Sequence, residues 1–151
     1  MQPVIDVVRS FYIAIDQGDL SKAGQYLSVD FQSAGLSSET LGKQERLDVV
    51  GRLQEAIPNL KHALSDMTYE GAVVKLTVQA GGRHTRPLDL SNLRMGIKEG
   101  IVPGSGKMII FQPDRFEYTI SQGKIRAERL VTPASGHSGV NGFLSALGVA
   151  L

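Results

Sequence analysis

The sequence of 151 residues contains no cysteine, and aromatic residues make up only 6% of it. The absence of cysteine excludes a disulfide framework, a thiolate nucleophile and a cysteine-based metal site. No apolar run approaches the roughly 20 residues that a membrane-spanning helix needs, and the first ten residues lack the apolar block of a signal peptide. We therefore expect a cytoplasmic protein that makes no membrane contact.

A strong charge of either sign is also missing. Lys and Arg number 16 and Asp and Glu 15, which leaves a formal net charge of +1. Such a balance gives no electrostatic reason to expect nucleic acid or anionic lipid as a partner. The 3 histidines are scattered along the chain without the spacing of metal ligands, so we expect no metal site.

Hydrophobic residues make up 42% of the chain, which is ordinary for a globular protein, and no linker divides it. A chain of this length can bury its core as a single domain over residues 1–151. The spacing of apolar residues predicts a helix over residues 3–17 and a short one from Asp19, which can cap it, to Leu27. A third helix is predicted up to Ile57, where Pro58 ends it.

Strict alternation of side chains over residues 72–84 predicts a strand, and Glu70-Gly71 predicts a turn that pairs it with residues 60–69 as a hairpin. Further strands are predicted at residues 29–34, 108–111, 115–120 and 124–132, with a long loop at 85–106 and a short C-terminal helix. Helices followed by a meandering sheet favour an α+β fold, with a curved antiparallel or mixed sheet wrapped around the N-terminal helices. An internal pocket between the two layers is the default ligand site.

Five segments carry a family resemblance. They are FYIAIDQGD (11–19), IPNLKHALSDM (57–67), EGAVVKLTVQAGGRHT (70–85), GIVPGSGK (100–107) and GFLSALG (142–148). Together they span nearly the whole chain, and the third aligns without gaps on a stretch that usually ends Gly-Thr-His-Thr. The sequence resembles the SnoaL-like polyketide cyclases of the nuclear-transport-factor-2-like superfamily. This resemblance implies a cone-shaped α+β barrel with an internal pocket, often assembled as a homodimer.

The resemblance also implies chemistry without metal or cofactor. In the family's cyclases an aspartate near the end of the last strand removes an acidic proton, and the enolate then closes a ring. Gly123-Lys124-Ile125 keeps the family pattern, but Arg129 stands where the family has Trp and Pro133 where it has Asp. Because proline cannot act as a base, an enzyme with this sequence would not use the usual cyclase base.

Three residues are candidates for acid–base catalysis. His84 matches the family histidine at a strand end, where it acts on a substrate oxygen or proton, or only makes an ordering hydrogen bond. His62 and Asp66 lie four residues apart, so strict alternation places both on the cavity face, where they could form a catalytic pair. A bulge between them would reverse that parity.

Arg129 and four aromatic residues are candidates for ligand binding. Alternation places Arg129 on the same face as Ile125, among apolar side chains, where a charge is costly unless it is paired or reaches water. We expect that Arg129 binds a ligand carboxylate or carbonyl, or that it forms an ion pair with Asp66 or Glu117. The aromatic residues occupy core-type positions and either line the pocket or belong to the core: Tyr12, Phe31, Phe111 and Tyr118.

These observations favour a protein with a small-molecule pocket. It would act without a cofactor as a cyclase, isomerase or hydratase on a polyketide-like or other hydrophobic carbonyl compound, and would form a homodimer through exposed sheet surface. The alternative is a non-catalytic ligand-binding or protein-interaction module of the same fold. An enzyme needs an ionisable group with a perturbed pKa in the cavity, whereas a binding module needs only shape and Arg129.

Overall fold

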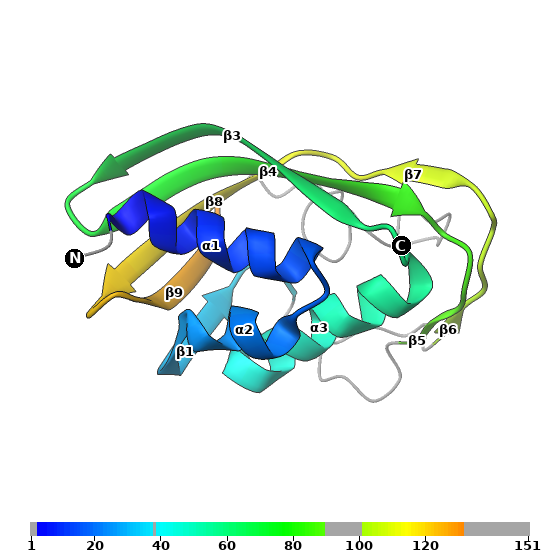
Figure 1. Ribbon diagram of the computed structural model, residues 1–151, viewed down its shortest axis with the longest axis horizontal. Coiled ribbons are helices and arrows are strands. Elements are labelled where there is room, and N and C mark those ends of the chain that lie inside the picture. Colours follow the sequence, from blue (N-terminus) through cyan, green and yellow to red (C-terminus); the bar gives the residue numbers. More distant parts are fainter. Residues whose placement is uncertain (1–2, 38, 90–100, 132–151) are drawn as a thin grey trace.

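A curved sheet wraps over three helices in the computed structural model, which describes residues 3–37, 39–89 and 101–131 (Figure 1). The helices are α1 (Val4–Asp16), α2 (Leu20–Gln25) and α3 (Lys43–Ala56). All three lie on the same side of the sheet, and α1 packs against β3, β4 and β9. The predicted α+β architecture is confirmed for this part of the chain.

The main sheet is mixed, because β1 runs parallel to β9 and the other pairs are antiparallel. Its strands in spatial order are β2 (Leu41–Gly42), β1 (Leu27–Ala34), β9 (Lys124–Leu130), β8 (Asp114–Ser121), β4 (Val73–Arg83) and β3 (Lys61–Glu70). A short strand, β7 (Met108–Ile110), pairs with the end of β4. A separate ribbon joins β5 (Leu88–Asp89) to β6 (Ile101–Val102) inside the predicted long loop. The predicted C-terminal helix falls outside the described residues.

Local sequence signals account for the ends of these elements. The Asp19 carboxylate accepts a hydrogen bond from the backbone N–H of Lys22 at 3.0 Å and so caps α2, as predicted. Gly71 turns the chain between β3 and β4 with φ at +59°, in the left-handed region that glycine adopts without strain. The predicted hairpin of these two strands is confirmed, and β4 supplies a buried row to the core.

A bulge in β3 overturns the predicted placement of Asp66. The register with β4 shifts between Ser65 and Thr68, and Asp66 adopts a positive φ of 51°. The extra residue reverses the alternation, so that Asp66 is exposed while His62 faces the helices. The prediction that Asp66 shares the cavity face with His62 is therefore wrong.

A second bulge, in β9, overturns the predicted placement of Arg129. Thr119 of β8 pairs with Ala127 but Ile120 pairs with Ile125, so Arg126 is an extra residue in β9. Beyond this bulge Glu128 points inward and is 1% exposed, whereas the side chain of Arg129 is 65% exposed. Arg129 forms an ion pair with Glu117 at 2.7 Å on the outer face of the sheet.

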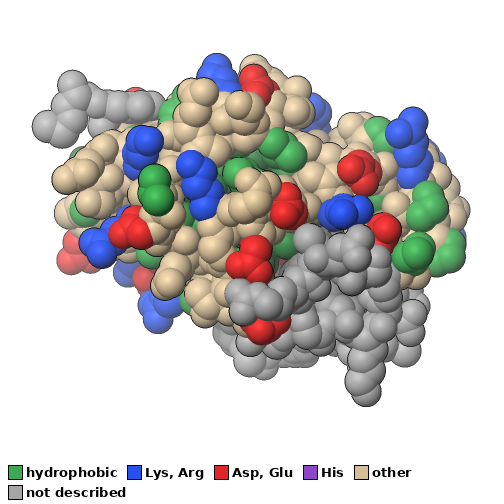
Figure 2. Space-filling model, turned by 90° about the horizontal axis from the view of Figure 1, so that it is seen from below, with side chains coloured by type: hydrophobic (Ala, Val, Ile, Leu, Met, Phe, Trp, Pro, Cys, Tyr) green, Lys and Arg blue, Asp and Glu red, His purple; other side chains and the backbone are tan. Residues whose placement is uncertain are grey.

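The surface of the described residues mixes both signs of charge. Lys and Arg side chains alternate with Asp and Glu over the face shown in Figure 2, with hydrophobic side chains between them. Among the described residues, no helix has the length and apolar character that crossing a membrane would require.

Candidate functional site

A cavity opens between the helices and the concave face of the sheet. Its wall combines apolar side chains with five polar ones, and α1, α3, β3, β4 and β8 all contribute to it. The residues that line it are Tyr12, Leu36, Arg46, Val50, Leu53, Leu60, His62, Val78, Ala80, Gln112, Asp114 and Phe116. The curvature of the sheet therefore creates an internal space, with ionisable groups set among hydrocarbon.

The interior of this cavity is narrow. The empty space amounts to about 460 Å³ when the open mouth is included, but the centre of a water molecule can occupy only about 30 Å³. Since one water needs roughly 10–15 Å³ by this measure, the interior has room for about two. A larger ligand would have to extend through the mouth or displace side chains.

His62 and Asp16 form a hydrogen-bonded pair at the edge of the cavity. Asp16 is the last residue of α1 and His62 is the second residue of β3, so the pair joins the helix layer to the sheet. The His62 Nδ1 atom lies 2.7 Å from Asp16 Oδ1, and the His62 backbone N–H donates to Asp16 Oδ2 at 3.1 Å. Because a carboxylate only accepts, Nδ1 of the neutral imidazole carries the hydrogen and Nε2 has a lone pair. The pair is arranged as a general base with an orienting carboxylate.

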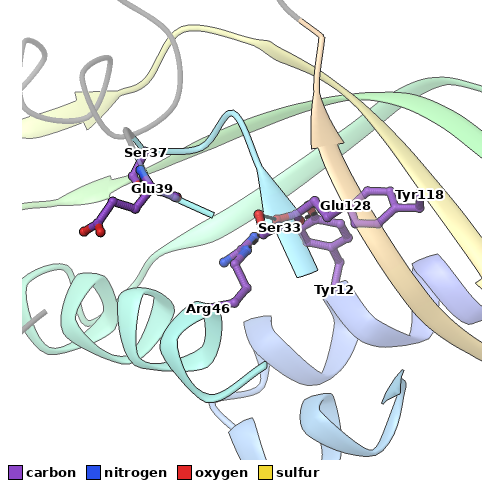
Figure 3. Close-up of polar contacts among 7 residues, drawn as sticks. All are labelled: Tyr12, Ser33, Ser37, Glu39, Arg46, Tyr118 and Glu128. Carbon is purple, nitrogen blue, oxygen red and sulfur yellow. Dashed lines mark hydrogen bonds and ion pairs between the residues drawn. The ribbon is translucent and has the colours of Figure 1, made fainter. Parts of the chain in front are cut away.

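A buried polar network, drawn in Figure 3, lies next to this pair, because its member Tyr12 contacts the ring of His62. Arg46 donates two hydrogen bonds to Glu128, from Nε to Oε1 at 2.7 Å and from Nη2 to Oε2 at 3.2 Å. Ser33 donates to Glu128 Oε1 at 2.5 Å, and Tyr118 donates to Oε2 at 2.6 Å. The hydroxyl of Tyr12 is hydrogen-bonded to that of Tyr118. Two members of this network, Tyr12 and Arg46, reach the cavity wall.

The network holds Glu128 in its ionised form. Burial alone would raise the pKa of the Glu128 carboxyl, but the Arg46 guanidinium and the hydrogen bonds that Glu128 accepts hold it below its ordinary value of 4.5. Burial, followed by the charge of Glu128, raises the pKa of the Tyr12 and Tyr118 hydroxyls above 10.0. At neutral pH the site therefore contains a charged Arg–Glu pair and two protonated tyrosines.

The structure places the residues proposed from the sequence in different surroundings. His62 and Tyr12 line the cavity, with ring centroids 5.3 Å apart, while Tyr118 lies behind Tyr12 in the network. Phe31 and Phe111 are buried in the core and do not border this cavity; Phe116 does.

His84 lies away from the cavity, at the far end of β4. Its backbone N–H donates to the carbonyl of Lys107 at 3.0 Å, and its own carbonyl accepts from Gly106 at 2.7 Å. The side chain is 0% exposed, and burial lowers the pKa of its imidazole. These backbone bonds tie the chain to the segment before β7, and the geometry of the cavity does not involve His84.

Sequence reasoning missed four ionisable residues of this region: Asp16, Arg46, Asp114 and Glu128. A signal for Arg46 was present, since it lies four and seven residues before Val50 and Leu53 on the buried stripe of α3. Asp16 meets His62 only through the packing of α1 on β3, which no local pattern encodes. Among the described residues, no group of three or more His, Asp or Glu is placed to hold a metal ion.

Solved structures share this fold at low sequence identity. A candidate SnoaL-like polyketide cyclase from Jannaschia sp. CCS1 is 18% identical with a TM-score of 0.69, over 98% of this chain and 93% of that one. IdmH, a candidate polyketide cyclase from Streptomyces antibioticus, is 18% identical with a TM-score of 0.69, over 98% of this chain and 100% of IdmH. AclR, a candidate hydroxylase from Streptomyces galilaeus, is 16% identical with a TM-score of 0.69, over 96% of this chain and 95% of AclR. These likenesses establish the cone fold of the nuclear-transport-factor-2-like type.

The sequence itself identifies the family. Among curated proteins no sequence matches this chain. The family model of the SnoaL-like polyketide cyclases, however, matches residues 6–135, which include every residue of the cavity wall and of the buried network. The chain therefore belongs to the SnoaL-like polyketide cyclase family.

Proposed function

We propose that this protein is a cofactor-free acid–base enzyme that acts on a small hydrophobic carbonyl compound, with His62 as the base. The observation that carries the proposal is the pairing of His62 with Asp16 at the wall of a largely apolar cavity. Imidazole changes its charge between pH 5 and 8, so it can take and return a proton near neutrality.

The reaction would begin with removal of a proton from the carbon next to the carbonyl group. The lone pair of His62 Nε2 forms the new N–H bond, and the electrons of the broken C–H bond move to the carbonyl oxygen as an enolate. Asp16 stabilises the imidazolium through its hydrogen bond at 2.7 Å. Arg46 is the charged donor of the cavity wall, and its guanidinium can stabilise the enolate oxygen. Reprotonation at another carbon, or attack on a second carbonyl, would complete an isomerisation or a cyclisation.

In this proposal the His62–Asp16 pair takes the place of the usual family base. Pro133, the residue at the position of the family aspartate, lies outside the described residues. The pair comes from α1 and β3 rather than from the end of the last strand, so the base of this enzyme would approach the ligand from a different wall of the cavity.

A non-catalytic ligand-binding module of the same fold is the second candidate. The observation that favours it is the narrow interior, together with the commitment of two donors of Arg46 to Glu128. In a binding module the network would shape the cavity, and the His62–Asp16 pair would fasten α1 to the sheet.

Proton exchange on simple ketones separates the two candidates. Cyclohexanone and 2-tetralone are incubated with the protein in D₂O, and the loss of the hydrogens next to the carbonyl is followed by NMR. If the protein is the proposed enzyme, exchange should be faster than in buffer alone. His62→Gln should lower the exchange rate at least tenfold, whereas the control Ala63→Gln, on the exposed face of β3, should not. Exchange at the buffer rate, or equal exchange in His62→Gln, would refute the proposed base and favour the binding module.

A further inference from the structure

The hydrogen bonds of the buried network have a fixed direction. Glu128 is fully buried and receives bonds from both Arg46 and Ser33, as an ionised carboxylate does. Such a carboxylate can only accept, so the 2.6 Å bond between Tyr118 and Glu128 Oε2 uses the hydroxyl hydrogen of Tyr118. Tyr118 has then no second hydrogen to offer.

The bond between the two tyrosines must therefore run from Tyr12 to Tyr118. A phenol has one hydrogen, and that of Tyr118 is already directed at Glu128. Tyr12 donates its own hydrogen inward and retains only lone pairs for any other partner. Figure 3 shows the side chains of Tyr12 and Tyr118 beside Glu128, with Arg46 of α3 reaching the carboxylate from the other side.

His62 adds a second acceptor to the same part of the wall. Its ring lies 5.3 Å from that of Tyr12, and its Nδ1 hydrogen is directed at Asp16. Nε2 of the neutral ring can therefore only accept. We call Tyr12 and His62 together the acceptor corner of the cavity. With the His62 ring in its neutral form, two polar side chains that usually both donate and accept are restricted here to accepting.

We propose that the acceptor corner selects hydroxylated apolar ligands, which give the O–H hydrogen that Tyr12 and His62 cannot supply. A phenol or an enol donates a hydrogen bond to the corner, whereas the corresponding ether turns lone pairs toward lone pairs. Apolar residues such as Leu53, Val78 and Phe116 contact the hydrocarbon part. This inference rests on the proposed function only in taking the cavity as the ligand site, since it requires no turnover.

Phenol and anisole form the matched probe pair, because they differ by the methyl group that replaces the hydroxyl hydrogen. Binding of each to the purified protein is measured by titration of backbone amide shifts around residues 112–116 at pH 7.5. Phenol should shift these amides with a dissociation constant several-fold lower than that of anisole, since a hydrogen bond of ordinary strength changes affinity by about three- to tenfold. Equal binding, or tighter binding of anisole, would overturn the proposal.

Three variants connect this preference to the network. Tyr12→Phe removes the acceptor and should reduce the ratio of the two constants toward one. Tyr118→Phe keeps Tyr12 but removes the group that takes its hydrogen, so it should reduce the ratio as well, even if Tyr12→Phe fails to fold. Tyr69→Phe, on an exposed tyrosine, should leave the ratio unchanged. A ratio that stays at the wild-type value in both cavity variants contradicts the assigned directions.

Neutron diffraction gives a test without any ligand. The proposal places the deuterium of Tyr12 between the two tyrosine oxygens and that of Tyr118 on the path to Glu128. A Tyr12 deuterium directed into the cavity would overturn it. Ketone exchange without a phenol preference would count against this inference alone, and a phenol preference without exchange would count against the proposed enzyme alone.

Discussion

Arg46 and Glu128 are joined by two hydrogen bonds in the centre of the protein, with 7% and 0% of their side chains exposed. They come from α3 and β9, 82 residues apart in the sequence. A buried pair of this kind stabilises little in comparison with apolar residues, because both charges lose their hydration. Breaking it, however, leaves one charge buried without its counterpart.

We predict that Glu128→Gln lowers the free energy of unfolding by about 3–5 kcal/mol, since the Arg46 charge then stays buried without its counter-ion. Urea unfolding followed by circular dichroism measures the loss. The matched control is Glu117→Gln, which breaks the exposed ion pair with Arg129 and should cost less than about 1 kcal/mol. Similar losses in the two variants would contradict the assigned role of the buried pair.

Asp16→Asn tests the positioning of the His62 ring. The amide keeps the size of the side chain but no longer stabilises the imidazolium, and it can turn its N–H₂ toward Nδ1. The rate of ketone exchange should fall by about tenfold or more, with little change in substrate affinity. If Asp16 only held α1 against β3, the free energy of unfolding would fall and substrate affinity would fall together with the rate. Ser28→Ala, which removes a surface hydrogen bond to Asp30, is the control.

The elements of this fold could be predicted because their signals are local. The apolar stripe of α1, the capping residue Asp19 and the turn at Gly71 each act within a few residues, and all three are found in the structure. The candidate site could be predicted only in part. His62 and Tyr12 were found because β3 begins in the expected register and α1 has a regular period.

The remaining site residues depend on single extra residues and on tertiary contacts. One additional residue, Arg126, turns Glu128 inward and Arg129 outward. The alternation of residues in β9 does not predict this bulge. The partner of His62 is Asp16 rather than Asp66 because α1 crosses the start of β3. Contacts between elements of this kind decide the chemistry of the cavity, and periodicity does not encode them.

Two buried groups predict that acid destabilises the protein in two pH ranges. Burial lowers the pKa of His84, so the folded state favours the neutral imidazole. The stability that His84 contributes is therefore complete above the ordinary pKa of 6.5 and is lost as the pH falls below that value. The pKa of Glu128 lies below 4.5, because Arg46 outweighs the effect of burial, so its contribution is lost only below that value. The urea midpoint should therefore fall between pH 7.5 and 5.5 and again below pH 4.5.

His84→Gln assigns the first of these losses. The variant should be less stable at pH 7.5 but should lose less stability between pH 7.5 and 5.5 than the wild type, because no imidazole has to be charged in the folded state. Glu128→Gln should retain that first loss. If His84→Gln has the same pH dependence as the wild type, another group titrates in this range and His84 does not govern it.

The bulge in β3 can be tested at Asp66, which adopts a φ of 51°. A β-branched side chain is strained in this left-handed conformation, whereas glycine adopts it freely. Asp66→Val should therefore lower the free energy of unfolding by about 1–2 kcal/mol, and Asp66→Gly should leave it unchanged or raise it. Thr68→Val, two residues further along the same strand, is the control for an added apolar group on the exposed strand, because threonine is already β-branched. A regular strand would give the opposite order, with valine favoured over glycine, and would return Asp66 to the face of His62.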